Sequence, residues 1–169
     1  MTRQVRAGAP AADPTGDGPR WLTPEEDRAW RGWRLMHLLL TARISADLAA
    51  DSGLSDPDYD VLSKLSEAGG QLRVTELAGS MRWSQSRLSH QLARMAGRGL
   101  VTRDSCAEDR RGTVARLTED GRRAVERAAP DHVASVRRHL IDRLSPAQLA
   151  ALAEIAETVT APPLPGETP

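Results

Sequence analysis

The stretch that decides the fold is residues 76–103, ELAGSMRWSQSRLSHQLARMAGRGLVTR. It predicts a brief helix from Thr75 to Met81, a turn, and a second helix that Ser84 caps and that runs to about Arg98. In the second helix, apolar side chains recur at helical spacing and are expected to face inward: Leu88, Leu92 and Met95. The pattern therefore predicts a helix-turn-helix.

The other face of the second helix is polar and basic. It carries Gln85, Ser86, Arg87, Ser89, His90, Arg94 and Arg98. In a helix-turn-helix the start of the second helix approaches base edges in the major groove, and a guanidinium pairs with guanine through two N–H groups. We expect base contacts from Gln85, Ser86, Arg87, Ser89 and His90, and phosphate contacts from Arg94, Arg98 and Arg103.

Two short apolar segments follow the second helix, Leu100–Arg103 and Thr113–Leu117, and predict a β-hairpin. A short linking strand is also expected at Leu72. The loop of the hairpin, CAEDRRG, holds an acidic residue beside two arginines. The order of these elements is that of a winged helix-turn-helix, so the fold class is mainly α with a small β-hairpin.

Further helices are predicted on both sides of this lobe. A capping box at Thr23 starts a helix over about 23–50, Asp56-Pro57 caps a helix from Asp58 to Ala68, and a second capping box lies at Ser145. Pro130 is expected to kink or break the long helix that Thr118 caps. The predicted organisation is a tail over 1–20, one domain over 21–160 and a tail over 161–169; within the domain the winged helix-turn-helix spans about 57–118 and dimerisation helices span about 23–50 and 119–160.

Composition excludes several classes of protein. The 169 residues, 40% hydrophobic, suffice for a core, and neither a long apolar run nor a signal-peptide pattern occurs, so we expect a cytoplasmic protein without a membrane partner. One cysteine and four histidines show no zinc spacing, so neither a metal nor a cofactor is expected. Although the formal net charge is zero, the segment 73–123 holds 11 arginines and 6 acidic residues, which makes the middle of the chain basic.

The segments ELAGSMRWSQSRLSHQLARMAGRGLVTR and DRRGTVARLTEDG resemble the multiple-antibiotic-resistance regulator (MarR) family. The resemblance implies a homodimeric winged-helix transcriptional regulator, usually a repressor, that binds a short palindrome and is released by a small molecule or an oxidant. It also implies that Asp109 pairs with Arg111 and directs it into the minor groove, while Arg110 is free to contact phosphate.

Apolar stripes on the first and last helices are longer than a small DNA-binding lobe would cover, which favours a homodimer over packing within one chain. Twofold symmetry would place two recognition helices about 34–36 Å apart, in successive major grooves. The expected partner is therefore double-stranded DNA with inverted half-sites.

Two features of the sequence are candidates for sensing an effector or an oxidant. Trp30, Trp33 and His37 share one helix face, which indicates either core packing or a cleft that binds a small aromatic effector with help from Arg34. Cys106 beside Arg110 and Arg111 is either an idle thiol or the site of a redox-sensing regulator.

Two other function classes compete with a DNA-binding regulator. No arrangement of nucleophile, base and orienting group is recognisable, so we expect no enzyme. A winged helix used only for protein contact is the second alternative, and a steep salt dependence of duplex binding would discriminate against it.

Overall fold

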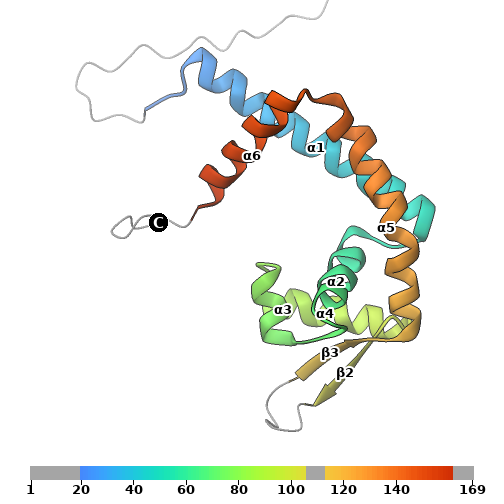
Figure 1. Ribbon diagram of the computed structural model, residues 1–169. Helices are drawn as coiled ribbons and strands as arrows, with labels where there is room; N and C mark the ends of the chain where they lie inside the picture. The colour runs from blue at the N-terminus through green and yellow to red at the C-terminus, as the bar shows by residue number, and fades with distance from the viewer. Residues whose placement is uncertain (1–19, 106–112, 162–169) are drawn as a thin grey trace, which may run out of the picture. The chain divides into compact units, whose positions relative to one another are not determined.

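The computed structural model describes residues 20–105 and 113–161 (Figure 1). The chain divides after His37 into two compact units, which are described separately. Helix α1 (Pro24–Ser52) begins in the first unit. Its predicted capping box is confirmed: the Glu26 N–H donates to Thr23 Oγ1 at 3.2 Å, and the Thr23 N–H donates to Glu26 Oε2 at 2.8 Å.

Three helices and a short strand build the helix-turn-helix. They are α2 (Asp56–Glu67), β1 (Gln71–Arg73), α3 (Val74–Ser80) and α4 (Gln85–Gly97). The cap of α2 differs from the prediction, because Ser55 rather than Asp56 is the N-cap and forms a capping box with Asp58. Ser84 caps α4 as predicted. Figure 1 shows α2, α3 and α4 gathered beside the sheet at one end of α5.

The predicted β-hairpin, which we call the wing, is formed by strands β2 (Val101–Ser105) and β3 (Thr113–Leu117) and belongs to a three-stranded antiparallel sheet. The two strands pair with Arg103 opposite Ala115, and β1 pairs with the other edge of β3, which gives the order β1-β3-β2. The short strand predicted at Leu72 is therefore an edge strand of the same sheet. It pairs with β3 and leads directly into α3, so the first helix of the helix-turn-helix is joined to the same sheet as the hairpin.

The C-terminal helices are α5 (Glu119–His139) and α6 (Pro146–Thr160), joined by the 3₁₀ turn η1 (Ile141–Arg143). Helix α5 continues through Pro130, so of the two outcomes predicted there, a kink or a break, the break does not occur. The predicted capping box of α6 is confirmed at Ser145. Within the described part of the chain, no helix is both long and apolar enough to cross a bilayer.

The core lies under the helix-turn-helix. Its fully buried side chains are Val61, Leu62 and Leu65 of α2, Leu77 of α3, and Leu88, Leu92 and Met95 of α4. Each large apolar side chain buried in this way contributes about 1.5–3 kcal/mol to folding. The inward face predicted for the second helix is confirmed, and the fold is mainly helical with a small sheet.

The first turn of α5 lies directly against the chain that leaves α4. Thr118 Oγ1 donates to the Gly99 carbonyl at 2.6 Å and accepts from the Gly121 N–H at 2.9 Å. A Cβ atom added at Gly121 would overlap the Leu100 carbonyl oxygen and lie 3.0 Å from its carbon. This close approach is the physical reason for a glycine in LTEDG.

Candidate nucleic-acid interface

Helix α4 separates its buried face from its exposed face. Leu88, Gln91, Leu92 and Met95 are buried, while Gln85, Ser86, Arg87, His90 and Arg94 are exposed and Ser89 is half-buried. The Arg87 N–H donates to Ser84 Oγ at 3.2 Å, which fixes the start of the helix. The structure therefore brings the predicted base-contacting residues together on one accessible side of α4.

The turn before α4 sets the direction of that helix. Arg82 adopts φ 52°, the one positive value at a non-glycine position among the described residues. For an L-residue this left-handed conformation costs roughly 1–2 kcal/mol. The turn is fastened by the Trp83 N–H, which donates to the Ala78 carbonyl at 2.9 Å. The indole of Trp83 lies under the guanidinium of Arg87, with 3.9 Å between Cζ and the ring centroid.

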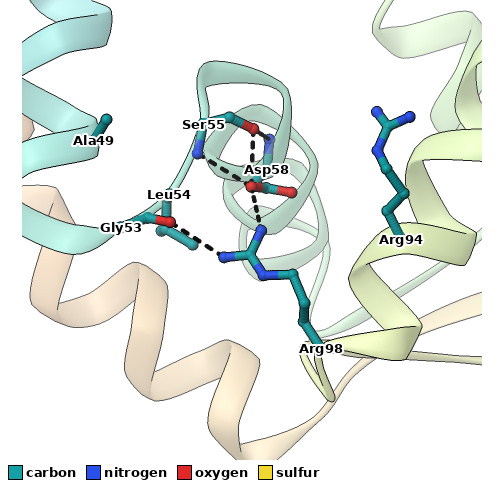
Figure 2. Close-up of a pocket in the computed structure, with 7 residues that line it drawn as sticks. All are labelled: Ala49, Gly53, Leu54, Ser55, Asp58, Arg94 and Arg98. Atoms are coloured by element: carbon teal, nitrogen blue, oxygen red, sulfur yellow. Dashed lines mark hydrogen bonds and ion pairs between the residues drawn. The ribbon is translucent and has the colours of Figure 1, made fainter.

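The two arginines near the end of α4 are held by protein groups. Arg98 donates from Nη1 to Asp58 Oδ2 at 2.6 Å and from Nη2 to the Gly53 carbonyl at 3.2 Å, while Arg94 donates to Gln91 Oε1. Figure 2 shows the Arg98 guanidinium turned toward Asp58 and Gly53, with Arg94 standing apart. Their predicted phosphate contacts remain predictions, and for Arg98 a contact would compete with the bonds to Asp58 and Gly53.

Asp58 is the centre of a buried polar network that sequence reasoning missed. Gln91 Nε2 donates to Asp58 Oδ1 at 2.7 Å, and Ser55 and Arg98 donate to Oδ2. Burial acts to raise the pKa of Asp58, but the hydrogen bonds from Ser55 and Arg98 together outweigh it, so the pKa lies below its usual value. The network joins α4 to the start of α2. A glutamine on the apolar face of α4, between Leu88 and Leu92, was the signal available for it.

The surrounding hollow is small. It has a volume of about 370 Å³ and is lined by Ala49, Gly53, Leu54, Ser55, Asp58, Arg94 and Arg98. Its polar groups Ser55, Asp58 and Arg98 already bond to one another. We therefore interpret the hollow as part of the structure that holds α4 in place.

The structure describes both strands of the wing, and the loop between them lies outside the described residues. Arg103 is exposed on β2, and the neighbouring pair Arg116–Asp104 joins β3 to β2 at 3.2 Å. Four residues of the predicted site, Cys106, Asp109, Arg110 and Arg111, lie outside the described residues, so their roles remain predictions.

The aromatic residues predicted to share one face of α1 stack on one another. The Trp30 and Trp33 rings lie 5.2 Å apart, the Trp33 and His37 rings lie 5.7 Å apart, and Arg34 lies over Trp30 at 5.9 Å. Trp30 is 48% exposed and Trp33 is 51% exposed. Core packing and a cleft for an aromatic effector both remain predictions for this face of α1.

A second network, also missed from the sequence, connects α1 to α5 within the second unit. Asp47 Oδ2 accepts from Ser135 Oγ at 2.7 Å and from Arg138 Nη2 at 2.6 Å, and it bonds to His139 Nε2 at 2.8 Å. Hydrogen bonds from Ser135, Arg138 and His139 hold the pKa of Asp47 well below its ordinary value. The Asp47 carboxylate therefore links α1 to the C-terminal end of α5 through hydrogen bonds.

We expect Asp47→Asn to lower thermal stability at pH 7 and to flatten the loss of stability in acid. The carboxyl has a lower pKa in the folded state, so its contribution is present above the unfolded pKa of about 4 and is lost as the pH falls below it. Melting curves between pH 3 and pH 7 measure this. Asp51→Asn, an exposed aspartate one turn further along α1, is the control, and equal acid profiles for Asp47→Asn and the wild type would contradict the assignment.

An exposed cationic helix, set after a tight turn and followed by paired strands, defines a DNA-binding winged helix-turn-helix. Comparison with known proteins identifies the family. A profile of the MarR family matches residues 54–113. AbsC, a MarR family transcriptional regulator from Streptomyces coelicolor, is 44% identical over 83% of this chain and 95% of its own, with a TM-score of 0.79. The chain belongs to the MarR family of transcriptional regulators.

Two further solved structures support the fold. Sco3205, a MarR family transcriptional regulator from Streptomyces coelicolor solved in complex with DNA, is 40% identical over 89% of this chain and 97% of its own, with a TM-score of 0.82. BpsR of Bordetella bronchiseptica, whose DNA binding is regulated by 6-hydroxynicotinic acid, is 21% identical over 79% and 99%, with a TM-score of 0.69. At that identity BpsR shares the fold alone. No curated protein sequence matches the chain.

Proposed function

We propose that this MarR family regulator is a homodimeric repressor that binds an inverted-repeat operator and releases it when a small aromatic molecule binds. The observation that carries the proposal is the exposed, basic face of α4 on a chain 40% identical to a regulator solved with DNA. Its proposed partner is chromosomal duplex, so we place the protein in the cytoplasm.

The DNA contacts follow from the positions of the side chains. We assign base edges to Gln85, Ser86, Arg87, Ser89 and His90, because these lie at the start of α4. Phosphates are assigned to Arg94 on α4 and to Arg103 on β2. The wing residues Asp109, Arg110 and Arg111 keep the roles that the family resemblance implies.

The dimer is supported by apolar side chains that the described chain leaves exposed. None of the residues of α6 is buried, and Ile155 and Val159 are 59% and 77% exposed. On α1, Leu38 is 65% exposed. Exposed apolar side chains on one helix are stabilised when another apolar surface covers them. The N-terminal and C-terminal helices of a second copy supply such a surface.

The effector is assigned from aromatic surfaces. The stack of Trp30, Trp33 and His37 offers ring faces, with Arg34 beside them. A second surface is a hollow of about 410 Å³ between α2, the turn before α4, and α5, where the Tyr59 and His132 rings lie 4.4 Å apart. Both suit a flat ring with a polar substituent.

Binding to duplexes selected from random DNA tests the proposal. We expect the affinity to fall by about a thousandfold between 50 and 200 mM salt, because about six or more phosphates are neutralised by the two copies. Fluorescence anisotropy measures it, and addition of hydroxylated aromatic acids should release the operator. Absence of any selected duplex would favour a protein-interaction module; a complex that no aromatic acid releases would contradict the effector.

A further inference from the structure

The Arg87 side chain is held by an aromatic ring before any DNA is present. Its Cζ lies 3.9 Å from the centroid of the Trp83 ring, well inside the roughly 6 Å range of a cation–π contact. Among the described residues the guanidinium makes no ion pair within 4 Å and no hydrogen bond, although its charge also opposes the burial that raises the pKa of Asp60 on α2. Arg87 therefore packs on Trp83, for which the sequence predicted no role beyond the turn.

The indole is the fixed member of this pair. The Trp83 side chain is half-buried and packs against the core cluster, and its backbone N–H donates to the Ala78 carbonyl at 2.9 Å, which holds the main chain that carries the ring. Arg87 is exposed, one turn further along the chain. A long exposed arginine otherwise loses rotamer freedom when it binds, so a rigid neighbour that limits its conformations reduces that loss.

The charge of Arg87 gains nothing from the helix that carries it. Arg87 is the third residue of α4, where the helix dipole disfavours a cation, and the first turn of α4 contains no acidic residue. Helix stability therefore does not explain an arginine here. A positive charge at the exposed start of this helix is suited instead to a ligand that is negative or rich in hydrogen-bond acceptors, such as guanine.

We propose that Trp83 is a positioning residue for sequence readout: its indole face preorganises the Arg87 guanidinium for a guanine in the operator. This inference rests on the proposed function, because it assumes that the start of α4 reads bases. It adds that sequence preference depends on a residue of the turn, behind the recognition helix, that need not touch DNA.

A double-mutant cycle tests the proposal on the full chain. Trp83→Leu keeps an apolar side chain but removes the ring face in both copies of the dimer, and we expect operator binding to weaken by about five- to thirtyfold. Trp83→Phe keeps a ring and should recover part of that loss. In an Arg87→Ala background, Trp83→Leu should cause no further change, because the residue that it positions is absent.

Two further readouts separate positioning from folding. Preference for the operator over a version with its contacted guanine replaced should fall in Trp83→Leu, whereas loss of folded protein would weaken binding to both duplexes alike. In NMR spectra of the free protein, the side-chain protons of Arg87 should show the upfield ring-current shift of a stacked group, and Trp83→Leu should abolish it.

The outcomes distinguish this inference from the proposed function. A wild-type chain that selects no duplex overturns both. A wild-type chain that binds an operator overturns the positioning role alone if Trp83→Leu binds it with the same affinity and preference, or weakens binding equally with and without Arg87.

Discussion

Gly121→Ala is expected to lower the free energy of unfolding by about 3 kcal/mol. The added Cβ would overlap the Leu100 carbonyl oxygen, and that atom belongs to backbone that the Thr118 N–H also binds, at 3.2 Å. Neither side of the contact is a flexible side chain. The first turn of α5 must therefore move away from β2, or the start of α5 must unwind.

Thermal unfolding at one protein concentration measures the effect, with a fall in Tm of about 10 °C expected. Gly79→Ala is the matched control, since it adds the same methyl group inside α3 where no atom lies within 4 Å. It should raise stability by about 0.5–1 kcal/mol, because alanine is the better helix former. Equal melting temperatures for Gly121→Ala and the wild type would contradict the close approach of α5 to Leu100.

Arg87→Ala is expected to weaken operator binding by at least about thirtyfold while leaving folding unchanged. Loss of a bidentate arginine–guanine contact costs about 1–3 kcal/mol, and the dimer loses one such contact in each half-site, so the sequence preference relaxes at one position of each half-site. The side chain is exposed and its main partner is the face of Trp83, so its removal opens no cavity in the core. Competition between single-base operator variants measures both the loss and the relaxed position.

Two other arginines serve as references for that experiment. Arg137→Ala removes the same charge near the far end of α5, some 27 Å along the helix from Glu119, and should leave operator affinity unchanged. Arg103→Ala should weaken binding to all duplexes alike and reduce the salt slope by about 2, because each of the two copies loses one phosphate contact. An Arg87→Ala protein that binds like the wild type would remove α4 from base readout.

Local features of the fold were predictable from the sequence. The capping boxes at Thr23 and Ser145 and the N-cap at Ser84 depend on hydrogen bonds between residues three apart, so their patterns are visible in a short window. The inward face of α4 follows from periodicity in the same way. At Pro130 a kink or a break was predicted, and the break did not occur, because a helix of 21 residues keeps enough other backbone hydrogen bonds to continue past one missing N–H.

Polar networks between distant segments were not predictable. Asp58 and Gln91 are 33 residues apart, and Asp47 and Ser135 are 88 apart, so nothing in a short window joins them. Arg98 and Arg87 belong to the same helical pattern in the sequence, but only Arg98 is paired with Asp58. This difference could not be predicted, because Asp58 lies 40 residues away along the chain. Side-chain charge and spacing showed which residues belong to α4, but only the packed fold shows which of them are already engaged.

The central claim is that two copies of this chain read an operator with the exposed start of α4. Methylation interference on a duplex selected by the wild-type protein tests it most directly, because a methyl group on guanine N7 blocks a major-groove contact. We predict two clusters of interfering guanines, related by inverted symmetry and centred about 10–10.5 base pairs apart. A single cluster, or a bound duplex in which no guanine interferes, would contradict the claim.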